Sequence, residues 1–218
     1  MDKDSIWTDS QRVAGALRDW IIRGELLPGT PLDQKRWASR LATDQATLRE
    51  AFAQLRYEGL VVEGDTQSRA KVRQVDADSV RDLYRMRYLI ETQALDHVGL
   101  ATPEELENML ECVATSRQAK RDDHWSLAGT TSLRFHQSLV AFLHCRSLSD
   151  YFESSLAHMR LVFALMSDEA SFQAPWVERD AEIADLVIRH QYERAKRALV
   201  AYLSDSEQAT LAVIAQQR

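Results

Sequence analysis

The chain has 218 residues, of which 45% are hydrophobic and 28% charged, and its formal net charge is −6 at pH 7. These values are ordinary for a soluble globular protein of one large domain or two modest ones. No apolar run approaches the roughly 18 residues of a membrane span, and the first residues lack the pattern of a signal peptide, so we expect a cytoplasmic protein without a membrane segment.

The net charge is unevenly distributed. Residues 9–75 hold 11 Lys and Arg against 9 Asp and Glu, whereas residues 76–218 hold 15 against 22. Only the N-terminal third can approach a phosphate backbone without strong repulsion. The two cysteines, Cys112 and Cys145, lack CxxC spacing, and we expect both to be buried, reduced thiols.

The first predicted element is an amphipathic helix over residues 9–23. Its apolar residues recur every fourth position, at Val13, Leu17 and Ile21. Gly24 is placed to end this helix, and Asp33 can cap a second, short helix that runs to Leu41.

A third helix is predicted over about residues 44–57, with Asp44 as its N-cap and Gly59 as its stop. Its buried stripe consists of Leu48, Phe52 and Leu55. The segments that follow, LVVEG and RAKVRQV, alternate like two short strands around a polar tip. Helix, helix, tight turn, helix and hairpin predict a winged helix-turn-helix domain over residues 1–75.

The rest of the chain, residues 76–218, contains few helix breakers. It predicts about six helices, near residues 78–99, 102–121, 123–143, 147–167, 174–189 and 191–215. Such helices form an antiparallel all-α bundle. The predicted fold is therefore mainly α: a winged helix-turn-helix followed by a helical domain for ligand binding and dimerisation.

Three polar positions on the third helix, Gln45, Arg49 and Arg56, lie within about 40° of one another beside the apolar stripe. Gln can pair with adenine, and Arg with guanine or a phosphate. Thr47 can donate its hydroxyl to a phosphate, and the N–H groups of the first turn can point at an anion.

The second strand of the hairpin adds a basic row, Arg69, Lys71 and Arg73, which can lie along a phosphate backbone or enter the minor groove. The alternative is that all these cations are solvated surface residues. The order and lengths of the elements favour DNA binding. The predicted DNA-contacting residues are Arg36, Gln45, Thr47, Arg49, Arg69 and Lys71.

Residues 17–72 resemble the DNA-binding domain of GntR-family regulators. LRDWIIRGELLPGTPL matches the family pattern L-R-x-x-I-x-x-G-x-L-x-P-G-x-x-L, and YEGLV matches its E-G-L-V ending. RWASRLATDQATLREAF matches the segment between them. The family's Ser-Arg pair reads Asp44-Gln45 here, its Pro reads Thr47 and its wing glycine reads Arg69. These departures imply an operator sequence and a wing geometry that differ from the family's usual ones.

Residues 79–215 are similar to the FCD effector domain of FadR-like regulators, through Arg87-Tyr88-Leu89-Ile90-Glu91 and Phe135-His136. Many such domains hold a divalent metal with one Asp and three His. The corresponding positions here read Ser132, His136, Asp180 and Tyr202. Neutral hydroxyls are weak metal ligands, so we expect no metal, although a residual one at His136 and Asp180 stays possible. The predicted effector-binding residues are Arg87, Ser132, His136, Asp180 and Tyr202.

The resemblance implies a homodimeric transcription regulator whose operator binding responds to a small-molecule effector. Without a metal, cations must hold an organic-acid effector, and Arg87, Arg134 and Arg160 are the candidates. One alternative is a constitutive DNA-binding regulator with a decayed effector pocket. The other is an enzyme built on the bundle, which we do not expect because the chain has no HExxH, GxSxG, GxxxxGK or GxGxxG motif.

Overall fold

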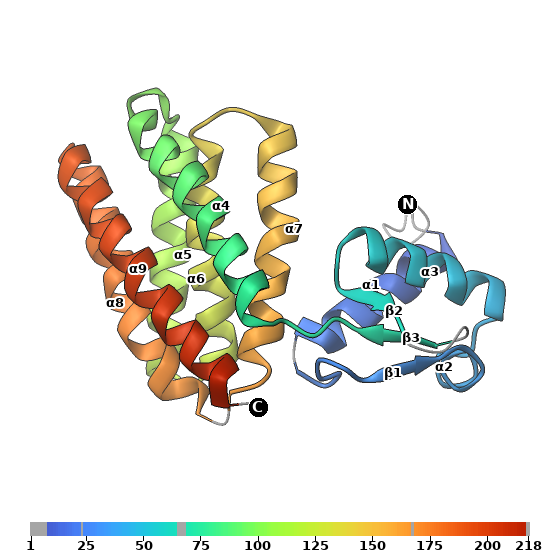
Figure 1. The fold of residues 1–218 in the computed structure, drawn as a ribbon. Helices are drawn as coiled ribbons and strands as arrows, with labels where there is room; N and C mark the ends of the chain where they lie inside the picture. Colours follow the sequence, from blue (N-terminus) through green and yellow to red (C-terminus); the bar gives the residue numbers. More distant parts are fainter. Residues whose placement is uncertain (1–7, 23, 65–68, 167, 217–218) are drawn as a thin grey trace. The chain divides into compact units, whose positions relative to one another are not determined.

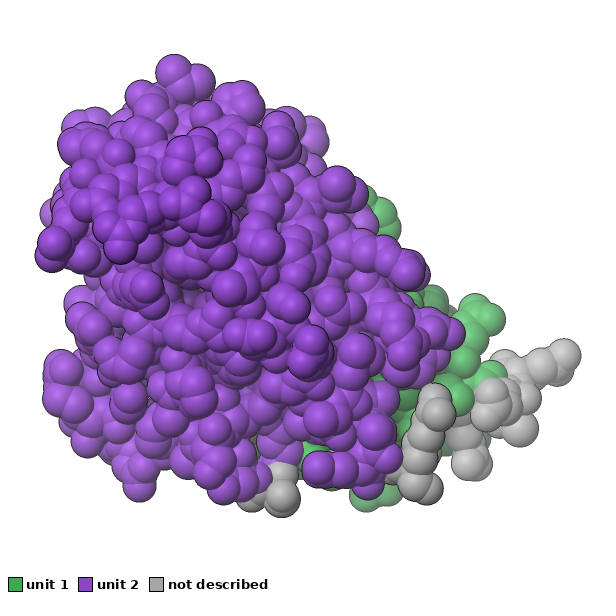
Figure 2. Space-filling view, turned by 60° about the vertical axis from the view of Figure 1, so that its left-hand side comes forward, with its two compact units in different colours: residues 1–75, 157–165 green, residues 76–156, 166–218 purple. Residues whose placement is uncertain are grey.

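The computed structural model of the chain describes residues 8–22, 24–64, 69–166 and 168–216 (Figure 1). Contacts divide the chain into two compact units, coloured separately in Figure 2: residues 1–75 with 157–165, and residues 76–156 with 166–218. Residues 157–165 therefore group with the N-terminal unit, although the prediction placed them in the helical part. They are the end of helix α7 (Arg146–Phe163) and the two residues after it.

The N-terminal unit begins with three helices and a small sheet. Its elements are α1 (Asp9–Ile22), β1 (Pro31–Asp33), α2 (Gln34–Arg40), α3 (Gln45–Tyr57), β2 (Val61–Glu63) and β3 (Arg69–Val72). Helices α1 and α3 pack together, and the predicted apolar stripe of α3 is buried, with Leu48, Phe52 and Leu55 at most 1% exposed. The predicted order of helices is confirmed.

Strand β1 is not among the predicted elements. The sheet has the order β1-β3-β2 with both pairs antiparallel, and Leu32 lies opposite Ala70. A three-residue strand is too short to show an alternating pattern, which explains why it escaped prediction. Residues 65–68, the predicted tip of the hairpin, lie outside the described residues.

An ion pair fixes α1 to the end of α3. Both nitrogens of the Arg18 guanidinium fork donate to Glu58, at 2.7 and 2.5 Å, and Gln54 also donates to the Glu58 carboxylate. Two parallel bonds restrain direction as well as distance. The pair thus holds the last turn of α3 against α1.

Replacing Arg18 with Met should lower the free energy of unfolding by about 1 kcal/mol, because the pair is largely shielded from water. Urea unfolding of the full chain measures this. The control is Arg12→Met on the same helix, whose partner Asp9 lies on the surface; we expect a change below about 0.5 kcal/mol there. Equal effects for the two variants would show that Arg18 has no special role.

The helical unit follows the predicted order with small shifts at the ends. It contains α4 (Ala77–Asp96), a short 3₁₀ turn η2 (Val98–Leu100), α5 (Pro103–Arg121), α6 (Trp125–Ala141), the first part of α7 (Arg146–Phe163), α8 (Glu169–Ile188) and α9 (Tyr192–Gln216). Helix α5 begins at its predicted position, with a capping box between Thr102 and Glu105. The mainly α fold class is confirmed.

Helix α8 starts five residues before its predicted position at residue 174. Its N-cap is Asp168, whose carboxylate accepts from the Ser171 N–H and hydroxyl at 2.9 and 2.6 Å. Pro175 lies inside the helix rather than at its start. Proline is more common in the first helical turn than inside a helix, so Pro175 gives no local sign that the helix begins at Glu169.

Two further expectations can be compared with the structure. No helix in the described ranges is long and apolar enough to cross a membrane. Cys112 is buried as expected, but Cys145 is exposed, so the expectation of two buried thiols is wrong for Cys145. Cys145 stands just before α7, in the turn after α6, where a short connection leaves its side chain at the surface.

Candidate functional site

The first candidate site is the exposed face of α3. Gln45, Arg49 and Arg56 are all exposed, next to the buried stripe that holds the helix on the core. Neither arginine pairs with a carboxylate in the described part of the chain. Three long polar side chains are thus presented to solvent from a helix that is firmly packed on its other side.

The start of α3 has the predicted N-cap, Asp44. Asp44 accepts hydrogen bonds from the N–H groups of Ala46 and Thr47 at 2.7 and 2.9 Å. The Thr47 hydroxyl donates to the second oxygen of Asp44 at 2.8 Å. The cap therefore occupies the Thr47 hydroxyl and two of the first-turn N–H groups, which are donors that we predicted for a phosphate or another anion. These three bonds lower the pKa of Asp44, so the cap is a carboxylate at neutral pH.

The basic residues around α3 differ in their surroundings. Arg36 is exposed on α2, and Lys71 is half-buried on β3. Arg69 lies on the same strand, but its side chain is outside the described part. Arg73 does not continue the predicted basic row, because its guanidinium donates to the backbone carbonyl of Gly59.

The second candidate site is a polar cluster inside the helical unit, on α4 and α6. Arg87 donates from Nε to Glu91 at 2.8 Å, and the other oxygen of Glu91 lies 2.6 Å from His136 Nδ1. All three side chains are at most 1% exposed. A buried carboxylate thus connects a buried guanidinium to a buried imidazole.

Asp180 of α8 and Tyr202 of α9 complete this cluster. Asp180 Oδ1 lies 3.6 Å from His136 Nε2, beyond hydrogen-bond distance. The Ser132 hydroxyl lies 3.4 Å from that of Tyr202, whose ring is 4.7 Å from the His136 ring. The five predicted effector-binding residues therefore gather in one buried place, supplied by four helices.

Burial governs the charges in this cluster. Burial raises the pKa of Glu91, but Arg87 and His136 lower it more, so it stays ionised. Burial and the Arg87 charge lower the pKa of His136 despite Glu91, so the imidazole is neutral at pH 7. Since ionised Glu91 can only accept, the His136 proton resides on Nδ1 and Nε2 is bare. Burial raises the pKa of Asp180 to about 8.

Several buried polar atoms of the cluster have no hydrogen-bond partner among the described residues. They are Arg87 Nη2, His136 Nε2, both carboxylate oxygens of Asp180, Gln173 Nε2 and Trp176 Nε1. Buried polar groups are almost always satisfied by protein, water or a ligand. Glu91, Gln173 and Trp176 were not predicted as members of the site. Helical spacing could have indicated two of them, because Gln173 and Trp176 lie on the same face of α8 as Asp180.

These residues do not suit a divalent metal. Glu91 lies at one nitrogen of the His136 ring and Asp180 at the other, so the two carboxylates cannot converge on one ion beside this histidine. The remaining positions, Ser132 and Tyr202, are neutral hydroxyls, which bind metals weakly. The described residues contain no group of three or more His, Cys, Asp or Glu with metal-binding geometry.

Two of the cations considered for an acid effector lie elsewhere. Arg134 is exposed on α6. Arg160 is buried, but it belongs to the segment that groups with the N-terminal unit, where it lies over the Phe163 ring. The expectation that these two arginines hold the effector is therefore wrong, and Arg87 alone belongs to the buried cluster.

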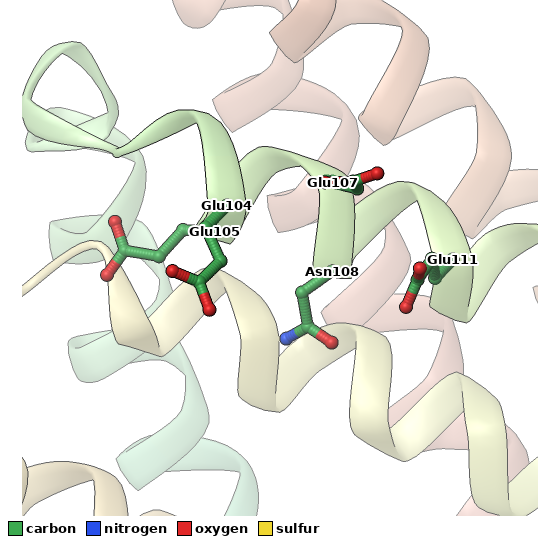
Figure 3. Close-up of a pocket in the computed structure, with 5 residues that line it drawn as sticks. All are labelled: Glu104, Glu105, Glu107, Asn108 and Glu111. Atoms are coloured by element: carbon green, nitrogen blue, oxygen red, sulfur yellow. The ribbon is translucent and has the colours of Figure 1, made fainter.

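A surface pocket of about 440 Å³ lies along α5 (Figure 3). Its lining residues all come from this helix: Glu104, Glu105, Glu107, Asn108 and Glu111. Carboxylates in a first helical turn stabilise its positive end, and Glu105 already serves in the capping box. Two of the four carboxylates that line this pocket, Glu104 and Glu105, thus have a structural role at the start of the helix.

Known families match both parts of the chain. Residues 82–205 match the FCD domain, and residues 9–68 match the family of bacterial regulatory proteins named gntR. The uncharacterised HTH-type transcriptional regulator YdhC of Bacillus subtilis (strain 168) is 24% identical over 195 residues, which cover 86% of this chain and 84% of YdhC.

Two solved structures are similar over nearly the whole length. A GntR transcriptional regulator from Rhodococcus sp. RHA1 has a TM-score of 0.86 at 29% identity, covering 93% of this chain and 97% of its own. McbR/YncC of E. coli has a TM-score of 0.76 at 19% identity, covering 97% and 99%. The second likeness concerns the fold alone.

Proposed function

Because this chain belongs to the GntR family of bacterial regulatory proteins and carries an FCD domain, we propose that a small molecule bound in its helical unit modulates its binding to operator DNA. The DNA-binding part rests on the exposed row of Gln45, Arg49 and Arg56, on a helix whose opposite face is buried. Neither arginine of this row pairs with a carboxylate among the described residues. A helix of this kind can enter the major groove and read base edges.

Binding of two half-sites requires two copies of the chain. We therefore propose a homodimer that assembles through the helical unit and places two α3 helices one helical turn apart on the operator. The effector changes the population of the arrangement that fits both half-sites. The buried cluster around Arg87, His136 and Asp180 is its binding site, because its unpartnered polar atoms require a partner that the described chain does not supply.

A constitutive regulator with a decayed pocket is the second candidate function. The cluster argues against it, since an interior freed from ligand binding is stabler with apolar side chains than with unpartnered polar ones. Operator affinity measured with and without candidate effectors separates the two functions. A change of affinity supports the responsive regulator, and a constant affinity across all candidates supports the constitutive one.

Replacing Arg49 with Ala should weaken operator binding by about 1–3 kcal/mol, because a bidentate contact to a base is lost. Fluorescence anisotropy with a selected operator measures this. The control is Arg146→Ala, which removes an equal charge from a fully exposed position on α7. Unchanged affinity of Arg49→Ala would refute the assignment of α3 as the recognition helix.

Replacing Asp44 with Asn should strengthen binding to any duplex about two- to fivefold at low salt. The amide oxygen still caps α3, while the negative charge next to the DNA face is removed. The gain should shrink as salt is added. Asp76→Asn, which changes the N-cap of α4 in the same way, is the control. If Asp44→Asn and Asp76→Asn shift the affinity equally, Asp44 does not face DNA.

A further inference from the structure

The buried cluster is asymmetric in its hydrogen-bonding needs. On one side Asp180 and the bare Nε2 of His136 stand together, with Nε2 3.6 Å from Asp180 Oδ1. The raised pKa of Asp180 leaves a proton on it at pH 7 in the free protein, and a cation bound beside it would displace that proton and leave two acceptor oxygens. The Ser132 and Tyr202 hydroxyls lie close enough to lower the pKa of Asp180, but neither makes a complete hydrogen bond to it. Whatever occupies this side must bring N–H or O–H donors.

Aromatic rings flank the acceptor side. The Tyr202 ring lies 4.7 Å from the His136 ring and 5.1 Å from the Trp176 ring. The guanidinium of Arg179 already lies over Trp176 and Tyr202, at 5.5 and 5.4 Å from their centroids. Aromatic faces attract cations, and the Arg179 contacts show that these two rings lie next to a positive charge in this structure.

The same cluster also contains unsatisfied donors. Arg87 Nη2, Gln173 Nε2 and Trp176 Nε1 have no acceptor in the described part of the chain. The Arg87 charge is held in place through its Nε contact with Glu91, which leaves the second edge of the guanidinium for another partner. A carboxylate is the group best suited to accept hydrogen bonds from a guanidinium edge and from neutral N–H donors at once.

We propose that the effector is a small zwitterion, an α-amino acid or close relative, whose ammonium group binds Asp180 and His136 Nε2 and whose carboxylate binds Arg87. This assignment rests on the proposed function, since it names the effector of the proposed site. A primary ammonium has three donors and no acceptor, which matches the bare Nε2 of His136 and the two oxygens of Asp180 once the bound cation has displaced the Asp180 proton. A hydroxyl can donate to only one of these acceptors, and an ionised carboxylate without an amino group can donate to none. No metal is needed in this arrangement.

The test is isothermal titration calorimetry of the full-length protein with the twenty common L-amino acids, in the presence of a chelator. For the tightest binder, its hydroxy-acid analogue and its decarboxylated amine are titrated as well. Each analogue should bind at least about tenfold more weakly, because each loses a hydrogen bond to a charged group. Asp180→Asn should weaken the amino acid by a similar factor, and Trp176→Phe, which removes only the N–H side of that ring, should weaken it less.

The matched control is Asp185→Asn on the same helix, an exposed carboxylate paired with Arg189, which should bind like the wild type. A hydroxy acid that binds as tightly as the amino acid would overturn the ammonium assignment. Binding by none of the amino acids would mean that water alone satisfies these groups, and would overturn the proposal. So would tight binding of Zn²⁺ or Mn²⁺, tested without chelator, that Asp180→Asn abolishes.

Operator binding is measured on the same preparations. A protein that binds its operator but no amino acid refutes this inference and leaves the DNA-binding function standing. A protein that binds no operator refutes the proposed function, whatever the calorimetry shows.

Discussion

Replacing Glu91 with Ala lowers the free energy of unfolding by about 3–5 kcal/mol, the largest effect expected in this chain. Glu91 is fully buried and carries the countercharge of Arg87, which is 1% exposed. Removing one partner of a buried pair leaves an uncompensated charge, which costs far more than the pair itself contributes. The variant also removes the acceptor that orients His136.

Urea unfolding of wild type and variant measures this cost. The control is Asp82→Ala, which breaks a surface pair with Arg85 on the same helix, both about three-quarters exposed; we expect less than about 0.5 kcal/mol there. The double variant Arg87→Met, Glu91→Leu should regain most of the lost stability, because it removes both charges. A loss below about 1 kcal/mol for Glu91→Ala would show that the pair is not buried as described.

Replacing Asp180 with Asn should stabilise the protein, and more so at higher pH. Asp180 has a pKa of about 8 in the folded state against 3.8 in the unfolded chain. Below about pH 4 both states are protonated. Between pH 4 and pH 8 the unfolded chain releases a proton that the folded protein keeps, so folding becomes less favourable as the pH rises. The asparagine has no proton to release.

The advantage of Asp180→Asn over wild type should therefore grow by about 3 kcal/mol from pH 5 to pH 8. The other ionisable groups near Asp180, namely Arg87 and Glu91 on α4, Cys112 on α5, His136 on α6 and Tyr202 on α9, are present in both proteins. The difference between the two unfolding curves thus isolates Asp180. A difference that does not change with pH would contradict its raised pKa.

Together with the calorimetry, Asp180→Asn tests whether the same side chain that lowers the free energy of unfolding raises the affinity for the amino acid. Asp180→Asn is expected to fold more stably and to bind the amino acid more weakly. Binding sites commonly keep polar groups that are unfavourable in the free protein because a ligand completes them. Improved stability with unchanged binding would place Asp180 outside the ligand contacts.

The helices of this chain could be predicted because their signals are local. The stripe of α3, its aspartate cap and the Thr102 capping box each occupy one turn or two of sequence. Strand β1 could not be predicted, since its three residues become a strand only through pairing with β3. The predicted start of α8 was five residues too late, because the helix begins at the Asp168 cap and continues through Pro175, a residue that is uncommon inside a helix.

For both candidate sites, the sequence predicted which residues take part better than it predicted the contacts between them. The exposed row on α3 follows from helical spacing alone, whereas the hydrogen bond from the Thr47 hydroxyl to Asp44 depends on side-chain rotamers. The cluster residues were located through family resemblance. Its internal chemistry, including the position of Glu91 between Arg87 and His136, depends on how α4 and α6 pack, which no sequence spacing specifies.

The proposed function depends most on sequence-specific DNA binding through α3, and selection of operators from random DNA by the full-length protein tests this binding most directly. We expect enrichment of a site with two related half-sites about one helical turn apart. The wild type should bind this site at least about tenfold more tightly than the Arg49→Ala variant does. A pool without any enriched sequence, or an enriched site that both proteins bind equally well, would contradict the account.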